Sequence, residues 1–380
     1  MFWDSTVSTA IDRRTFLILG AGGLVALAGP AGIAGAAIPR PRYLSVRLHR
    51  DTGRYVAAVA NAHGRTLRAF DLPGRGHFIA ARPGHDEAIA FARRPGTFAL
   101  AFPTGEQGEA HAFQTPEDRH FQGHGLFDAT GRTLFTTEND FDGERSVIGI
   151  YDAADGYRRI GEMPSHGIGA HQLALMPDGK TLAVANGGIL THPDMGRTKL
   201  NIPTMRPSLA YIEAASGRLA DQWAPAPERQ RKLSIRHLAV LADGRVAFAC
   251  QDQQPMGDVP ALAFVHNPGA GAPLTLAAPD TVYQAMAGYC GSVATANGLI
   301  AVSAPRGNRI VFWDAASATL AGEIPLADGC GIAPGPRPET FALTSGDGRF
   351  VVAAPGAEAG PQPSAPAGAA WDNHLTRVFG

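Results

Sequence analysis

The chain has 380 residues, a formal net charge of −1 at pH 7 and three cysteines. The nearly balanced charge excludes an extended basic surface of the kind that binds nucleic acid or anionic membranes. Three cysteines are too few for a disulfide framework, and 46 glycines and 29 prolines between short apolar runs indicate a β-rich globular protein.

The first predicted element is an export signal over residues 1–37. Arg13 and Arg14 form a twin-arginine motif, an uncharged apolar run at 18–28 follows, and small residues suited to signal-peptidase cleavage come next. We therefore expect export to the periplasm and a mature domain over residues 38–380. The apolar run is short for a bilayer span and no later segment is apolar enough, so we expect no integral membrane segment after signal removal.

A repeating unit occupies most of the mature chain. Each unit starts with a histidine or cysteine, continues as a short apolar strand, turns at a glycine and returns as a second apolar strand. The residues at this repeat position are His77, His124, His171, His237, Cys290, Cys330 and His374. They lie 47, 47, 66, 53, 40 and 44 residues apart, which is close to the length of a β-propeller blade with one insertion.

The repeat predicts an all-β fold, a single seven-bladed β-propeller. Each interval holds about four short strands separated by Asp-Gly, Thr-Gly and Asn-Gly turns. Six units run over residues 77–355, and the seventh is expected to be composite. Its inner strand would come from around His374 and its other strands from residues 43–48, 55–60 and 66–70, so that N- and C-terminal strands close one blade. A two-sheet sandwich fits less well, because one unit recurs at blade length throughout.

The repeat position is also the candidate site. The inner strand of each propeller blade lines the central channel, so the seven side chains at this position are expected to converge on the axis. Imidazole and thiolate are ligands that soft and borderline metals prefer, which predicts a transition-metal site with iron or copper as the candidate ions. The alternative is structural, because many propeller blades carry a histidine that only satisfies hydrogen bonds within the blade.

The cysteines and one insertion leave further alternatives open. Cys290 and Cys330 could ligate a metal, or could form a disulfide in an oxidising compartment. The insertion in the third unit, residues 187–208, is predicted to be a lid or a partner-binding loop. Arg236 and His166 are candidates to orient the neighbouring imidazoles, and the alternative is that both are simply solvated.

Several segments of the chain resemble one known family. They include Gly123-His124-Gly125, Thr-Thr-Glu-Asn-Asp at 136–140, His-Gly-Ile-Gly-Ala-His at 166–171, Leu-Ser-Ile-Arg-His at 233–237 and Trp-Asp-Asn-His at 371–374. These segments are similar to an uncharacterised family of exported bacterial propellers, a domain of unknown function. That family is encoded beside imelysin-like and di-haem-type periplasmic proteins of iron uptake. The resemblance therefore implies iron acquisition, with periplasmic iron-uptake proteins as partners, by association alone, and it implies no catalytic residues.

Familiar catalytic motifs do not decide the function. The sequence has no hydrolase elbow, phosphate loop, dinucleotide fingerprint or haem-attachment motif. The leading interpretation is a non-catalytic periplasmic metal-binding or accessory protein, in iron acquisition. The alternatives are a metal- or haem-dependent oxidoreductase working at the channel mouth, and a non-catalytic scaffold that docks a partner protein.

Overall fold

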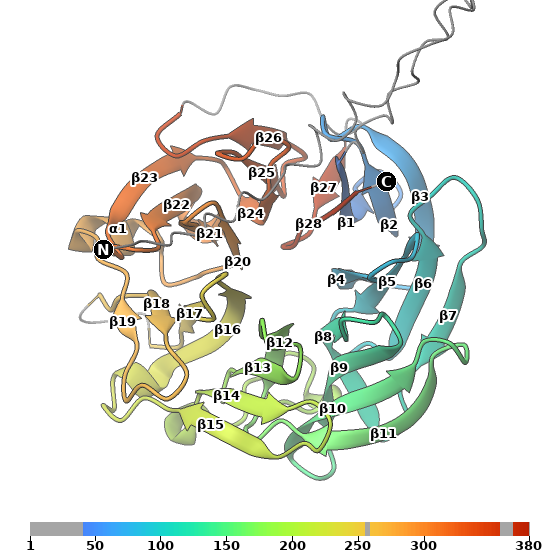
Figure 1. The fold of residues 1–380 in the computed structure, drawn as a ribbon, viewed down its shortest axis with the longest axis horizontal. Helices are drawn as coiled ribbons and strands as arrows, with labels where there is room; N and C mark the ends of the chain where they lie inside the picture. The colour runs from blue at the N-terminus through green and yellow to red at the C-terminus, as the bar shows by residue number, and fades with distance from the viewer. Residues whose placement is uncertain (1–40, 255–258, 358–367, 380) are drawn as a thin grey trace, which may run out of the picture. The chain divides into compact units, whose positions relative to one another are not determined.

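The computed structural model describes residues 41–254, 259–357 and 368–379, which form a seven-bladed β-propeller (Figure 1). This confirms the fold class that the repeat predicts. The predicted export signal over residues 1–37 lies outside the described residues. Within the described ranges, no helix is both long enough and apolar enough to cross a membrane.

Blades 1 to 3 each contain four antiparallel strands, with the first strand of each innermost in the ring (Figure 1). Blade 1 consists of β4 (Gly76–Ala81), β5 (Glu87–Ala92), β6 (Phe98–Pro103) and β7 (His111–Gln114). Blade 2 consists of β8 (Arg119–Phe127), β9 (Thr133–Asp140), β10 (Arg145–Asp152) and β11 (Arg158–Pro164). Blade 3 consists of β12 (Ala170–Leu175), β13 (Thr181–Asn186), β14 (Ser208–Glu213) and β15 (Leu219–Trp223).

Blades 4 and 5 repeat this pattern, and blade 6 has three strands among the described residues. Blade 4 consists of β16 (Leu233–Val240), β17 (Val246–Asp252), β18 (Ala263–His266) and β19 (Leu274–Thr275). Blade 5 consists of β20 (Ser292–Ala296), β21 (Leu299–Ala304), β22 (Arg309–Asp314) and β23 (Leu320–Pro325). Blade 6 consists of β24 (Gly329–Pro334), β25 (Phe341–Ser345) and β26 (Phe350–Ala353).

The helical elements of the described chain are short and lie in connections between strands. Helix α1 (Asp280–Ala285) joins blades 4 and 5. The 3-10 turns are Pro193–Met195, Ile202–Thr204, Gln230–Lys232 and Pro305–Gly307. The first two belong to the insertion between β13 and β14.

Blade 7 combines both ends of the described chain, as predicted. It consists of β1 (Pro41–His49), β2 (Arg54–Ala60), β3 (Thr66–Leu72), β27 (Ala369–Trp371) and β28 (Thr376–Phe379). Both C-terminal strands pair antiparallel with β1, and Leu48 lies opposite Ala370 while Leu44 lies opposite Thr376. The inner strand of this blade is thus split in two, and His374 lies in the break.

Apolar contacts between neighbouring blades hold the inner strands in place. The second strands β5, β13 and β17 are buried and alternate alanine with larger apolar residues, which lets adjacent sheets approach closely. Larger rings fill the space between blades. Phe91 and Phe121 join blades 1 and 2 with ring centroids 5.7 Å apart, and Phe312 and Phe341 join blades 5 and 6 at 5.3 Å. These contacts give the residues around the axis a rigid support.

Candidate metal centre

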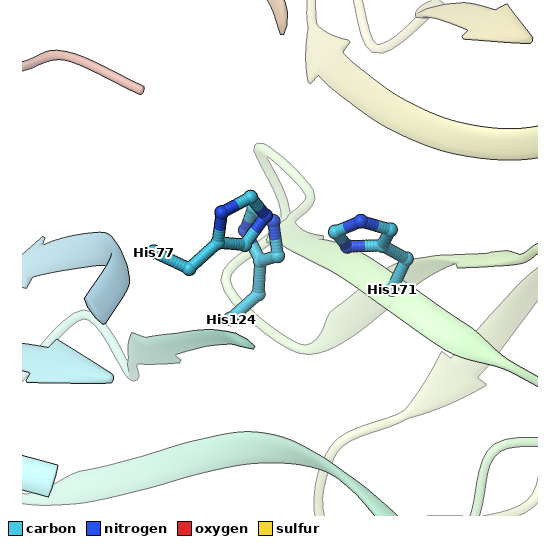
Figure 2. Close-up of side chains that lie close together, drawn as sticks. All are labelled: His77, His124 and His171. Carbon is cyan, nitrogen blue, oxygen red and sulfur yellow. The ribbon is translucent and has the colours of Figure 1, made fainter. Parts of the chain in front are cut away.

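Five of the seven side chains at the repeat position converge on one volume inside the ring of inner strands. They are His77, His124, His171, His237 and His374, from blades 1, 2, 3, 4 and 7. The ring centroids of His124 and His171 are 4.6 Å apart, those of His237 and His374 4.9 Å, and those of His77 and His374 4.6 Å. Figure 2 shows three of these rings, His77, His124 and His171, gathered together although they come from separate blades.

An irregularity in the inner strands accompanies these histidines. The pairing of β4 with β5 shifts register between Gly76 and Ile79, and that of β12 with β13 shifts between Ala170 and Leu173. The same kind of shift occurs in β8 and β16, again beside the histidine. A bulge interrupts the ladder and redirects a side chain, which is why bulges gather beside functional sites. His374 reaches the cluster from the break between β27 and β28.

Close packing of blades 1 and 2 requires a glycine beside His124. Gly123 has a φ of +103°, and a Cβ atom there would lie 2.6 Å from Cδ2 of His77. Glycine adopts such a φ without steric strain, and its missing side chain leaves room for the imidazole. The Gly-His-Gly motif of this segment therefore has a steric origin in the site itself.

Two sets of three histidines have ring nitrogens close enough to hold one ion. The first set is His77, His124 and His171, and the second is His124, His237 and His374. Within each set the ligand atoms lie within 4.8 Å of one another. His124 belongs to both sets and is 1% exposed. Three imidazoles can hold a metal and leave a further coordination position for another ligand.

All five imidazoles are in the neutral form at neutral pH. Burial lowers the pKa of each one, that of His374 to about 4 and those of the others well below the usual value. The positive charge of Arg236 lowers the pKa of His171 further. The neighbouring imidazoles likewise lower the pKa of His124 further. A neutral imidazole has a lone pair on one nitrogen, and this is the form that binds a metal.

Several buried ring nitrogens have no hydrogen-bond partner among the described residues. They are Nδ1 and Nε2 of His124, Nδ1 of His171 and Nε2 of His374. Leaving a buried polar atom unsatisfied costs about 1–3 kcal/mol, so a group that supplies the missing partner stabilises the fold. A metal ion accepts lone pairs from several imidazoles at once, and the donor set fits such an ion.

Carboxylate and amide groups orient two of the rings. Oδ1 of Asp372 lies 3.2 Å from Nδ1 of His77, and its other oxygen accepts a 2.8 Å hydrogen bond from Nε of Arg75. A carboxylate bonded to one ring nitrogen sets the tautomer and turns the other nitrogen toward an ion. Oε1 of Gln172 lies 3.3 Å from Nδ1 of His237 and contacts that ring as Asp372 contacts the ring of His77.

The two cysteines at the repeat position belong to neither histidine set. Sγ of Cys330 lies 3.2 Å from the carbonyl oxygen of Asp372, in an apolar cluster between blades 6 and 7. Cys290 is fully buried in a cluster that also contains Cys250. All three cysteines lie in the described part of the chain and are free thiols there. Burial raises the pKa of Cys290 to about 12, which keeps its thiol protonated at neutral pH.

A cavity of about 500 Å³ opens beside the cluster, and His77, His171 and His237 form part of its wall. Most of the charged residues in its wall are basic. Spacing along the sequence did not indicate this, because the arginines are scattered over several connections and strand β16. The insertion predicted to be a lid or a partner-binding loop contributes Arg197 and Lys199 to the wall. Arg236, one of the two predicted orienting residues, also lines the cavity, whereas Nε2 of His166 lies 2.9 Å from the carbonyl oxygen of Gly217.

Fold and site together define a seven-bladed propeller with clustered histidines that could hold a metal ion. The chain belongs to the family described as "Protein of unknown function (DUF1513)", whose model matches residues 70–378. This confirms the resemblance to an uncharacterised family, while twin-arginine export and imelysin-like neighbours stay predictions. No curated protein matches the sequence.

Two solved structures illustrate how widely the fold occurs. A chain of Kuenenia stuttgartiensis hydrazine synthase is 12% identical, with a TM-score of 0.59 over 86% of this chain and 98% of that one. A chain in the crystal structure of a mitotic checkpoint complex is also 12% identical, with a TM-score of 0.54 over 83% of this chain and 81% of that one. At such identities the likeness shows the fold alone.

Proposed function

We propose that this protein binds one transition-metal ion, iron or copper, at the histidine cluster, and acts as an exported, non-catalytic accessory protein in iron acquisition. The observation that carries the proposal is the group of neutral, buried imidazoles, in which four ring nitrogens, on His124, His171 and His374, lack a hydrogen-bond partner among the described residues. A structural histidine elsewhere in the fold differs in this respect. Nδ1 of His266 lies 2.7 Å from the hydroxyl of Tyr211, and its Nε2 lies 3.2 Å from the carbonyl oxygen of Ala270.

The ligands in this proposal come from the five histidines. Imidazole suits iron and copper, and equally zinc and nickel, so the donor set defines a class of first-row ions. Within that class we favour iron, because the family that the sequence resembles is encoded beside proteins of iron uptake. Cys290 and Cys330 are predicted ligands too, but their thiols pack in apolar clusters outside both histidine sets, so we assign them no share in holding the ion.

Metal content of the protein purified after export, without refolding, tests the site. Elemental analysis should find about one ion per chain. His124→Ala should lose the ion, because His124 belongs to both sets. His63→Ala is the matched control, since it removes an exposed imidazole outside the cluster. A folded His124→Ala variant that retains the full metal content would overturn the proposal.

Two further variants decide which set holds the ion. If His171→Ala loses the metal ion and His374→Ala retains it, the first set holds the ion. The reverse result assigns the ion to the second set. Cys290→Ser and Cys330→Ser should both keep the ion. Loss of metal from either folded serine variant would restore that cysteine to the ligand set.

The physiological part of the proposal needs a cellular test. A strain lacking the protein should grow more slowly under iron limitation and contain less iron, and the tagged protein should be found in the periplasmic fraction in a manner that depends on Arg13 and Arg14. Normal growth with unchanged iron content would refute the role in iron acquisition, and cytoplasmic retention would refute export.

An oxidoreductase is the second candidate, because the cavity gives a small molecule access to the cluster. His77, His171 and His237 all line its wall, and a catalytic metal needs such an open approach. Oxygen consumption with ascorbate as electron donor, compared between the metal-loaded wild type and His124→Ala, tests this candidate for redox-active ions. Equal rates in the two proteins would count against it.

A further inference from the structure

The cavity beside the histidine cluster has the size of a small-molecule site. Its volume is about 500 Å³, and ligand pockets commonly span roughly 300–1,000 Å³. Residues from several blades and from the insertion between β13 and β14 form its wall. The packed ring of blades therefore holds most of this wall in place, which favours binding of a ligand of defined shape.

The charge of the wall is strongly positive. The cationic side chains are Arg75, Arg93, Arg94, Arg197, Lys199, Arg236 and Arg306. The carboxylates in the wall are Asp252 and Asp328, so seven cations less two carboxylates leave an excess of five positive charges. Two residues of the wall pair with residues outside it: Asp252 pairs with Arg229, and Arg75 pairs with Asp372. The positive charge of Arg229 and the negative charge of Asp372 cancel each other, so the excess stays the same. The chain as a whole has a net charge of −1, so this excess is local.

Five of the arginines in the wall have no acidic partner among the described residues. In the ranges that the structure describes, ion pairs are absent for Arg93, Arg94, Arg197, Arg236 and Arg306. Arg236 is 8% exposed, and its Nε atom has no hydrogen-bond partner within the described part of the chain. Burial and the charges of Arg236, Arg197 and Arg93 lower the pKa of Arg94 to about 9, which leaves it cationic at neutral pH. Like charges held this way repel one another until an anion joins them.

Neutral hydrogen-bonding groups complete the wall. Gln122, Gln251 and Asn373, which carry amides, and Tyr289, which carries a hydroxyl, line the same cavity. Guanidinium groups bind carboxylate and phosphate through paired N–H donors, and amides and hydroxyls can donate to the remaining oxygens. The number of cations exceeds what one monovalent anion needs, so a ligand with several anionic groups matches the wall better than acetate or chloride.

We propose that this cavity binds a small multivalent oxyanion, a molecule carrying two or more carboxylate or phosphate groups, and holds it beside the histidine cluster. The cations from the insertion, Arg197 and Lys199, stand at an exposed part of the wall and attract the ligand. Arg94 and Arg236 bind its anionic groups farther in. The site needs no metal at the histidines, so it goes beyond the function proposed above and stands or falls separately.

Calorimetric titration of the chelator-treated full-length protein tests the site. The probes are propane-1,2,3-tricarboxylate, pyrophosphate and acetate, because the first lacks the hydroxyl that helps citrate to chelate metals. The multivalent probes should bind at least about 100-fold more tightly than acetate, and their affinity should fall as salt is raised. Binding of the tricarboxylate alone assigns a carboxylate ligand, and binding of pyrophosphate alone assigns a phosphate ligand. No binding of either at millimolar concentration, or acetate binding as tightly, would overturn the proposal.

Three substitutions connect the binding to named residues. Arg94→Gln should weaken binding of the multivalent probe about 10-fold or more, because a hydrogen bond between charged groups is lost. Arg197→Gln repeats the test on an exposed residue of the insertion, where misfolding is not a concern. Arg65→Gln, at an exposed position outside the cavity, is the matched control. Unchanged affinity in folded Arg94→Gln and Arg197→Gln would refute the assignment.

The histidine cluster and the cavity can be separated experimentally. His124→Ala should keep the affinity for the multivalent anion while it loses metal, since His124 is not in the cavity wall. Arg197→Gln should show the reverse pattern. If His124→Ala abolishes anion binding by the metal-free protein, the cavity is not an independent site.

Discussion

Acidification should destabilise the metal-free protein through its buried histidines, and His374 allows the effect to be sized. In the folded state burial lowers the pKa of His374 from 6.5 to about 4. Between these values the unfolded chain binds a proton that the folded chain does not bind. The free energy of unfolding therefore falls as the pH falls from about 6.5 toward 4.

The two pKa values set the magnitude. At pH 5 they correspond to a loss of about 2 kcal/mol for His374, and below pH 4 to about 3 kcal/mol. Burial also lowers the pKa values of His77, His124, His171 and His237, so each of them adds a loss in the same direction. Losses of this size are large beside the total stability of roughly 5–15 kcal/mol of a folded protein.

Urea unfolding of the chelator-treated protein at pH 7.5 and pH 5.0 measures this loss. Wild type should lose about 2 kcal/mol more between the two pH values than His374→Gln, whose side chain does not titrate. The exposed His63→Gln variant serves as the control and should lose as much stability as wild type. Equal losses in wild type and His374→Gln would refute the assignment of a neutral, buried imidazole to this position.

Three other predictions concern the residues around the cluster. Gly123→Ala should displace His77 and reduce the metal content. Gly84 also has a positive φ but an open Cβ position, so Gly84→Ala should destabilise the protein without loss of metal. Elemental analysis and thermal unfolding together distinguish the two outcomes. Asp372→Asn should weaken metal binding about 10–100-fold, measured by competition with a chelator, because the carboxylate no longer orients His77. All three cysteines are buried, so a thiol reagent should label none of them in the native protein and all of them in urea, and labelling of a native thiol would contradict the packing.

The propeller and its composite blade are predictable because their signals recur along the chain. One pattern appears at blade length in unit after unit, and the strand after His374 can only find a partner at the other end of the chain. The repeat position itself indicates where the backbone lies and not which way the side chain points. At Cys330 the thiol lies against the carbonyl oxygen of Asp372, while the longer imidazoles of the other units reach one another.

The basic cavity could not be predicted in this way. Its arginines come from several parts of the ring, with Arg75 before β4, Arg197 between β13 and β14, Arg236 on β16, and Arg306 between β21 and β22. None of them belongs to a long run of basic residues, which would indicate a basic site. The nearly balanced net charge of the chain does not indicate one either. Only the arrangement of blades brings these charges to one place.

The split inner strand of blade 7 links the histidine cluster to the order in which the chain is made. His374 and Asp372 come after the other histidines of the cluster in the sequence, and both lie between β27 and β28, which pair with β1. A nascent or C-terminally truncated chain therefore contains neither the fifth imidazole nor the carboxylate beside His77. An ion held by His374 together with His124 and His237 would bind the closed ring in preference to the open one. By mass action, such an ion would stabilise the pairing of β27 and β28 with β1.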